Sequence, residues 1–317
     1  MTRGAVIGRA IAALAAVGLL VAIVRAVGVG ATLPSLARVA PWLPLLGALE
    51  AGVVAFDAIA LAALYRAAGR TAPARPFWRA VFLANVVAAG LPLGRLLSEG
   101  WKAVRLAPRV GGPVAAAGAV GSQAAVLLGN AAIALVSLAG VALRCGATWP
   151  TLAVGGLALV MSAAGLAVAL AGRARLGRWL GARFTIARAQ GPAFDDAFAA
   201  ATPALGVAAA WETAARLLQI AQVATLLHAL GHPAGAVDAL AAHGLVLTGA
   251  ALGDALPGQL GATDALLALA AVRLDLAAPD ALALTLGLHG AQLGLALVGG
   301  AAALALSDDP APHEGPA

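Results

Sequence analysis

Three charged side chains in one apolar part of the sequence are spaced to act together. Glu99 and Lys102 lie three positions apart and Arg95 precedes Glu99 by four, so a helix would place all three on one face. Charges at bilayer depth cost at least ~2.5–3.5 kcal/mol each and usually have a function. The cluster therefore suggests a polar cavity for a phosphate or a lipid headgroup. An amphipathic helix at the membrane surface is the alternative.

A second charged pair, Glu212 and Arg216, is spaced by four residues in a later apolar stretch. Such a pair can either line a pathway or hold two helices together by mutual neutralisation. Glu50 and Asp57 share one face of an earlier stretch, since they are seven residues apart. They either face the same cavity or find an arginine partner such as Arg216.

The remaining polar residues indicate no metal centre or enzyme active site. His228, His243 and His289 are candidate proton carriers, although interior histidines are more often only hydrogen-bonded. Cys145 is the single cysteine, which excludes a metal site built from cysteines. The sequence contains no P-loop, HExxH or Gly-x-Ser-x-Gly motif. We expect no metal, no cofactor and no enzymatic activity.

The composition places these polar residues in a membrane protein. Of the 317 residues, 62% are hydrophobic and 11% are charged, and the mean hydropathy is +0.94. Soluble domains are nearer half apolar and a quarter charged. This excludes a soluble enzyme, a disordered chain and a nucleic-acid binder, despite a pI near 11.1. The chain is expected to be an integral membrane protein.

Charge is distributed very unevenly along the chain. Residues 1–188 contain 18 basic and 3 acidic residues, whereas residues 189–317 contain 2 basic and 11 acidic ones. Basic residues hold loops in the cytoplasm, while acidic residues have little effect on topology. The basic runs at 66–79 and 173–188 therefore predict cytoplasmic loops, with both chain termini on the same side.

Apolar stretches of the length needed to cross a bilayer predict an all-α polytopic protein. We expect six crossings, at 5–24, 41–65, 113–143, 149–171, 202–230 and 281–306.

Two further stretches are broken by proline and glycine. The breaks are Pro92 and Gly94 in 80–109, and Pro257, Gly258 and Gly261 in 237–273. We expect helices at 80–91 and 94–105 that form a re-entrant hairpin, because a turn near Pro92 keeps the basic residues after it cytoplasmic. The stretch around Pro257 predicts a second hairpin. A proline-kinked span is the alternative.

The two breaks also suggest an internal repeat. Pro92 and Pro257 are 165 residues apart, and each precedes an acidic residue, Glu99 or Asp264, by seven. The same offset superposes 41–65 and 113–143 on the fifth and sixth crossings. We therefore predict two membrane repeats, 1–143 and 144–306, and a disordered cytoplasmic tail at 307–317. Three crossings each would make the repeats inverted, and paired breaks in inverted repeats indicate a transporter's substrate site.

Two motifs resemble a known family. Asn85-Val-Val-Ala-Ala-Gly-Leu-Pro92-Leu-Gly94, followed by Ser98-Glu99-Gly-Trp-Lys102-Ala103, resembles the pattern Asn…Leu-Pro…Gly-Glu-x-x-Arg-Ala. Leu256-Pro257-Gly258-Gln-Leu-Gly261-Ala-Thr-Asp264-Ala265 resembles Leu-Pro-x-x-x-Gly-x-x-Glu-Ala. Both patterns belong to the lysylphosphatidylglycerol synthetase transmembrane region, or flippase-like domain family, and the resemblance covers essentially the whole chain. This sequence departs from the family at Ser98, Lys102 and Asp264, and His289 lies near a position where the family often has arginine.

The resemblance implies a flippase-like protein of the bacterial inner membrane that moves a lipid between leaflets. The lipid would be of the phospholipid, polyisoprenoid-linked or hopanoid type, and no aminoacyl-transferase domain accompanies the membrane region. The candidate substrate-binding residues are Asn85, Arg95, Glu99, Lys102, Glu212, Arg216, Asp264 and His289. Membrane lipids are the expected partners. The alternative is an accessory or scaffold subunit for a lipid- or envelope-modifying enzyme, or a homo-oligomer, associating through small-residue helix faces.

Overall fold

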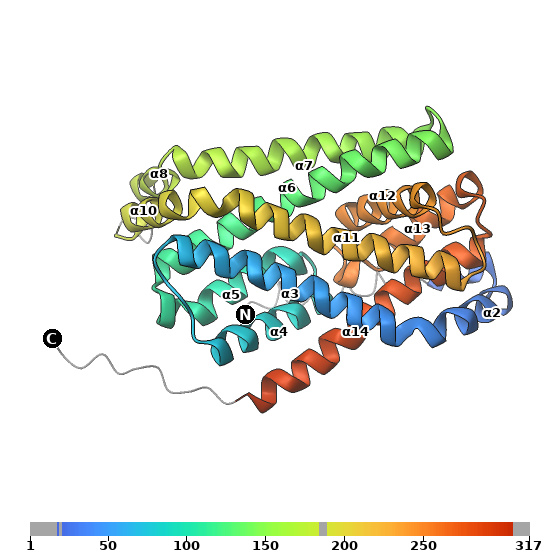
Figure 1. Cartoon of the computed structure of the whole chain (residues 1–317), viewed down its shortest axis with the longest axis horizontal. Helices are drawn as coiled ribbons and strands as arrows, with labels where there is room; N and C mark the ends of the chain where they lie inside the picture. The colour runs from blue at the N-terminus through green and yellow to red at the C-terminus, as the bar shows by residue number, and fades with distance from the viewer. Residues whose placement is uncertain (1–17, 19–20, 184–188, 307–317) are drawn as a thin grey trace.

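The computed structural model describes residues 18, 21–183 and 189–306, and all of its regular structure is helical. The helices form an elongated bundle (Figure 1). No strand occurs in the described part of the chain, which confirms the all-α prediction. The crossing expected at 5–24 lies mostly outside the described residues, and the tail at 307–317 lies entirely outside them.

Five long helices lie within a few residues of five predicted crossings. They are α3 (Leu43–Ala67), α6 (Gly112–Cys145), α7 (Trp149–Arg173), α11 (Leu205–Ala229) and α14 (Ala278–Ala305). A further helix, α2 (Val29–Val39), and the short η1 (Ala40–Trp42) precede α3.

Four described segments are long and apolar enough to cross a membrane. They are Val29–Ala67, Gly112–Cys145, Trp149–Ala171 and Ala278–Ala305. Helix α11 has 25 residues, as α3 does, but it contains Glu212 and Arg216, and it is not among the four. The chain is thus a helical protein with several membrane-spanning candidates, while six crossings stay a prediction.

Two helical hairpins occupy the proline-broken stretches. The first is α4 (Ala74–Gly90) and α5 (Gly94–Val110), and the second is α12 (Ala236–Leu252) and α13 (Ala262–Ala270). The helices of each hairpin pack against each other. The second also contains η3 (Pro257–Gln259) before α13 and η4 (Ala271–Leu274) after it.

The hairpin helices differ in length from the prediction. Helix α4 begins six residues before the expected start at 80, because Pro76 lies in its first turn, where a missing N–H costs nothing. Helix α5 runs five residues beyond 105, past Pro108, and ends at Val110, where Gly111 follows with φ 93°. The second break was expected at Pro257 but begins at Gly253, because α12 ends at Leu252.

The two breaks have the same backbone conformation at their prolines. Leu91 and Leu256 are both extended, as a residue before proline prefers. Leu93 and Gly258 then adopt left-handed conformations, with φ 53° and 60°. At Gly94 the chain passes so close to α4 that a Cβ would lie 2.2 Å from the carbonyl oxygen of Ala88. Only glycine fits this turn.

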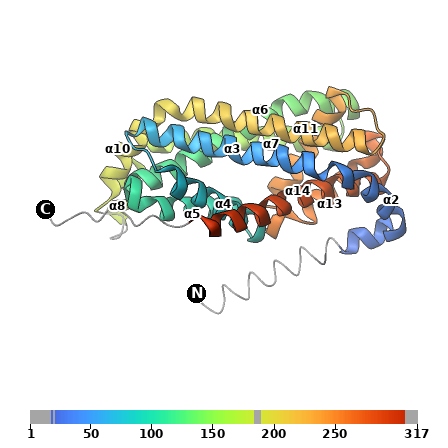
Figure 2. The ribbon, with the colours of Figure 1, turned by 60° about the horizontal axis from the view of Figure 1, so that its bottom comes forward.

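The tips of the two hairpins meet inside the bundle. The N–H of Leu93 donates to the carbonyl oxygen of Asp254 at 2.8 Å. A Cβ at Gly258 would lie 3.2 Å from the oxygen of Ala89 on the first hairpin. The hairpins approach this point from opposite ends of the molecule, α4 and α5 from the end that carries α10, α12 and α13 from the end that carries α2 (Figures 1 and 2).

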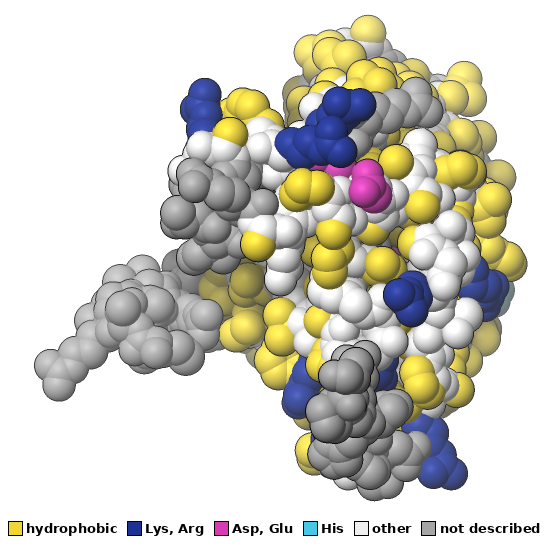
Figure 3. All heavy atoms as spheres, turned by 90° about the vertical axis from the view of Figure 1, so that its left-hand side faces the viewer, with side chains coloured by type: hydrophobic (Ala, Val, Ile, Leu, Met, Phe, Trp, Pro, Cys, Tyr) yellow, Lys and Arg dark blue, Asp and Glu magenta, His cyan; other side chains and the backbone are white. Residues whose placement is uncertain are grey.

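Helices α8 (Leu176–Arg183) and α10 (Gly191–Ala201), followed by η2 (Thr202–Ala204), occupy the described part of the stretch between α7 and α11, where a loop was predicted at 173–188. Asp195 accepts hydrogen bonds from the backbone N–H groups of Gly177 (2.7 Å) and Arg178 (3.0 Å), which fixes the two helices together. Figure 3 faces this end of the bundle and shows several groups of Lys and Arg side chains with little acidic surface. We call it the basic end.

Candidate functional site

A cavity of about 130 Å³, here called the central cavity, lies between the first hairpin and helices α3, α6, α11 and α14. Its polar lining comes from six helices and from the tip of the second hairpin. The lining side chains are Glu50, Asp57, Asn85, Arg95, Ser98, Glu99, Lys102, Gln123, Arg216, Gln219, Gln259 and Gln292. Six of the eight predicted substrate residues are therefore in this cavity or, in the case of Glu212, paired with a residue that lines it.

Glu99 and Lys102 form the ion pair that their spacing predicts. Lys102 Nζ lies 2.6 Å from Glu99 Oε1, and the two side chains are 9% and 12% exposed. Burial follows from the packing of α5 on α4 and α6. The second carboxylate oxygen of Glu99, Oε2, is buried without a hydrogen-bond partner. The pair thus keeps one free acceptor at the cavity wall.

Glu212 and Arg216 form the second predicted pair, on α11. Arg216 Nη2 lies 3.2 Å from Glu212 Oε2 and 4.0 Å from Asp57 Oδ1 on α3. Arg216 Nη1 donates to Gln219 Oε1 at 3.0 Å. Gln222 donates to Glu50 Oε2 at 3.1 Å, which joins the same two helices again. These contacts hold α3 and α11 side by side behind the cavity.

Arg95 differs from the other two cations of the cavity. Within the part of the chain that the structure describes, its guanidinium makes no hydrogen bond or ion pair, while Lys102 and Arg216 are both paired. A guanidinium is a planar donor that suits carboxylate and phosphate oxygens. The cavity therefore contains one cation without a partner, Arg95, together with the carboxylates of Glu50 and Asp57 on α3. It can bind an anionic group at Arg95 and a positive or polar extension of that group at the carboxylates.

Asp264 and His289 lie beside a second, smaller cavity. This cavity has a volume of about 30 Å³, and its walls include His243, Thr263, Thr285 and His289. Asp264 is fully buried and lines neither cavity directly. Its position seven residues after proline matches that of Glu99, but the structure places the two carboxylates in separate polar centres.

The two cavities adjoin each other. Arg95, Gln219, Gln259 and Gln292 line both of them. Glutamines in apolar helices usually form hydrogen bonds between helices, and these three also line the cavities. Gln292 follows His289 by three residues on α14, so both lie on one helix face.

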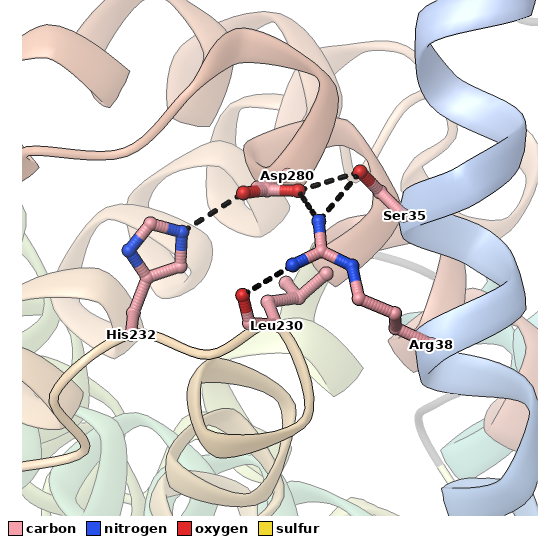
Figure 4. Close-up of polar contacts among 5 residues, drawn as sticks. All are labelled: Ser35, Arg38, Leu230, His232 and Asp280. Carbon is pink, nitrogen blue, oxygen red and sulfur yellow. Dashed lines mark hydrogen bonds and ion pairs between the residues drawn. The ribbon is translucent and has the colours of Figure 1, made fainter.

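A polar network at the end opposite the basic end had no signal in the sequence (Figure 4). Asp280 at the start of α14 accepts from Ser35 (2.5 Å) and Arg38 (2.6 Å) on α2, and its other oxygen lies 2.9 Å from His232 Nε2. Arg38 also donates to the carbonyl oxygen of Leu230 at 2.6 Å. The network joins α2, α14 and the loop after α11.

A neighbouring arginine makes two further ion pairs at this end. Arg144, near the end of α6, lies 3.1 Å from Asp238 at the start of α12 and 2.8 Å from Asp275 after η4. These pairs fix the base of the second hairpin to α6.

No family model matches the chain, and neither does any of the curated proteins or solved structures with which it was compared.

Proposed function

We propose that this chain is a flippase-like membrane protein that translocates a lipid between leaflets of the bacterial inner membrane, with the headgroup passing through the central cavity. The observation that carries the proposal is the unpaired guanidinium of Arg95 in the central cavity, which also contains carboxylates. The lipid is of phospholipid, polyisoprenoid-linked or hopanoid type. The family resemblance of the two Leu-Pro motifs supports this class of cargo.

The outside of the bundle supports a cargo whose tails stay in the membrane. Leucines project fully from α7 and α14, with Leu152 76%, Leu159 72%, Leu297 76% and Leu304 77% exposed. Such surfaces are stable against hydrocarbon and costly in water. A lipid whose headgroup enters the central cavity while its tails lie along the apolar helices would have its polar part in the polar cavity and its apolar part in hydrocarbon.

We further propose that the two halves are inverted repeats with re-entrant hairpins. The order of elements supports it, because α2, η1, α3, a hairpin and α6 correspond to α10, η2, α11, a hairpin and α14. The packing supports it as well: α4 packs on α14 as α12 packs on α6, α3 on α14 as α11 on α6, and α2 on α14 as α10 on α6. Rocking of one half against the other would open the cavity to each side in turn.

The proposed orientation has the basic end and both termini in the cytoplasm. Arg66, Arg70, Arg75 and Arg178 belong to loops and helix ends at the basic end. At the other end, Arg38 and Arg144 are paired with aspartates. An excess of arginine on one side is the pattern of cytoplasmic loops.

The test is the movement of a fluorescent phospholipid across proteoliposome membranes. Lys102→Gln and Glu99→Gln are expected to slow it, because each leaves a buried partner uncompensated at the cavity wall. Arg105→Gln is the matched control, since Arg105 lies on the same helix but is exposed. Equal rates in Lys102→Gln and Arg105→Gln would contradict the proposed site. Absence of transport by the wild type, with a stoichiometric enzyme copurifying, would favour the accessory subunit instead.

A further inference from the structure

A groove between α3 and the start of α4, here called the α3–α4 groove, lies at the basic end, where the loop between these helices is found (Figure 1). Its volume of about 360 Å³ is within the ~300–1,000 Å³ typical of small-molecule sites. The lining residues are Ala58, Ile59, Ala62, Tyr65, Arg66, Thr71, Ala72, Ala74, Phe77 and Trp78. Ala58 is the one residue that also lines the central cavity, so the α3–α4 groove is a second site with its own polar groups.

The packing of the bundle leaves the α3–α4 groove hollow. Helix α3 packs mainly on α11, while α4 packs mainly on α5 and α14. On the α3 wall, Ala58 and Ala62 contribute only methyl groups. The ring of Tyr65 lies against α6, so closely that a Cβ at Gly118 would be 2.3 Å from its Cε1 atom. No described side chain therefore fills the space between α3 and α4.

The mouth of the groove is polar and can hold an anion. Arg66 and Thr71 are both exposed there, and neither side chain has a hydrogen-bond or ion-pair partner in the described part of the chain. None of the lining residues is acidic. A guanidinium and a hydroxyl are both donors, and phosphate oxygens are acceptors that a guanidinium can bind in pairs. The mouth thus fits a phosphate group.

The rest of the groove is apolar over the depth of one leaflet. Ile59 forms one wall, and the rings of Phe77 and Trp78, with centroids 6.0 Å apart, form the other. From Arg66 to Ala58 the helix rises by ~12 Å, since each residue adds ~1.5 Å. The hydrocarbon of one leaflet is ~15 Å deep. An acyl chain that enters below a phosphate at the mouth therefore matches the groove in length and polarity.

We propose that the α3–α4 groove binds one anionic phospholipid of the cytoplasmic leaflet. Its phosphate accepts hydrogen bonds from Arg66 and Thr71, and one of its acyl chains lies between α3 and α4. The nearby Arg70 and Arg75 add positive charge that favours an anionic over a zwitterionic headgroup. The inference goes beyond the proposed function, because this lipid stays in one leaflet and lies outside the central cavity.

The choice of lipid is tested by native mass spectrometry of the full chain, stripped of lipid and titrated in detergent. The probes are dioleoyl-phosphatidylglycerol, which has one net negative charge, and dioleoyl-phosphatidylcholine, which has the same chains and no net charge. An arginine near the surface contributes about 1 kcal/mol, so the wild type should bind phosphatidylglycerol roughly fivefold more tightly or better. Equal binding of the two lipids would show unspecific surface lipid only. Competition by glycerol 3-phosphate would show a site for a free phosphate; either result would overturn the proposal.

Variants of the mouth locate the bound lipid. Arg66→Gln should weaken phosphatidylglycerol binding roughly fivefold and remove the preference over phosphatidylcholine. Arg70→Gln is the matched control, because Arg70 is exposed in the same loop but does not line the groove. Arg95→Gln, in the central cavity, should keep the preference. Binding that is lost in Arg95→Gln and kept in Arg66→Gln would place the lipid in the central cavity and overturn the groove site, while the proposed function would stand.

A variant that fills the groove tests the position of the acyl chain. Ala62→Leu places a larger side chain in the lining and should weaken binding of both lipids. Ala67→Leu, on an exposed position of the same helix outside the lining, should bind as the wild type does. Melting temperatures without lipid show whether both variants fold. Wild-type affinity in a folded Ala62→Leu protein would contradict the proposed place of the chain, and if Ala62→Leu does not fold, the result with Arg66→Gln decides.

Discussion

The backbone N–H of Leu93 donates to the carbonyl oxygen of Asp254 at 2.8 Å, which joins the tips of two hairpins that approach from opposite ends of the bundle. Both groups belong to breaks in helices, where backbone polar groups have no partner within their own helix. In an apolar bundle an unsatisfied backbone group is costly. The tips therefore satisfy each other, next to the residues that line the central cavity.

The tight turn of the first hairpin predicts that adding one methyl group at Gly94 lowers the stability of the protein. Gly94→Ala would place a Cβ 2.2 Å from the carbonyl oxygen of Ala88. We expect a loss of about 1–3 kcal/mol of stability, the usual cost of overpacking. Gly100→Ala on the same helix has nothing within 4 Å of its Cβ and should be neutral or stabilising. Thermal unfolding in detergent would measure both, and equal melting temperatures would show that the turn is not constrained as described.

The buried pair on α11 predicts a non-additive response. Glu212→Gln leaves Arg216 with Asp57, at 4.0 Å, as its one carboxylate partner among the described residues, and removing one member of a buried pair costs about 3–5 kcal/mol. The double variant Glu212→Gln with Arg216→Gln should recover part of this loss, because the uncompensated guanidinium is gone and Asp57, which loses its partner at 4.0 Å, is 34% exposed. Melting temperatures of the two singles and the double measure the coupling. Additive losses would mean that the two side chains do not stabilise each other.

The rate at which a maleimide labels Cys145, the single cysteine, should depend on the ion pairs that Arg144 makes next to it. Cys145 is buried beside Arg144, whose side chain holds Asp238 and Asp275. Arg144→Ala is expected to raise the rate at which a maleimide reacts with Cys145, because α6 is freed from the base of the second hairpin. Arg178→Ala at the basic end serves as the control and should leave the rate unchanged. A similar rate in all three proteins would contradict the described role of Arg144.

The re-entrant hairpin has a direct topological test. In a Cys145→Ala background, Arg70→Cys before α4 and Arg105→Cys on α5 should be labelled from the same side of the membrane. Ala234→Cys, in the exposed loop before α12, should be labelled from the opposite side. Labelling of Arg70→Cys and Arg105→Cys from opposite sides would mean that α4 and α5 form a crossing, and the inverted-repeat proposal would fail.

Local spacing predicted the parts of the site that lie on one helix. The pairs Glu99–Lys102 and Glu212–Arg216 are three and four residues apart, so helix geometry alone brings them together. The positions of α6 and α7 could also be predicted locally, because each is an apolar stretch long enough to cross a bilayer. The hairpin bounds did not, because Pro76 and Pro108 lie near helix ends, where proline is tolerated.

Contacts between distant segments had no local signal. Ser35 and Asp280 are 245 residues apart in sequence, and nothing near either residue specifies the other. Asp264 repeats the proline-plus-seven position of Glu99, yet it pairs with His289 and not with the first hairpin. Which face of α13 meets α14 depends on the packing of the whole bundle, and a repeat in sequence does not contain that information.

The central claim is that the central cavity carries an anionic headgroup across the membrane, and Arg95 tests it most directly. A charge-assisted hydrogen bond contributes about 1.5–3 kcal/mol, so Arg95→Gln should slow fluorescent phospholipid movement in proteoliposomes roughly tenfold or more. Arg105→Gln should move the lipid at the wild-type rate. Equal rates in wild type and Arg95→Gln would contradict the account.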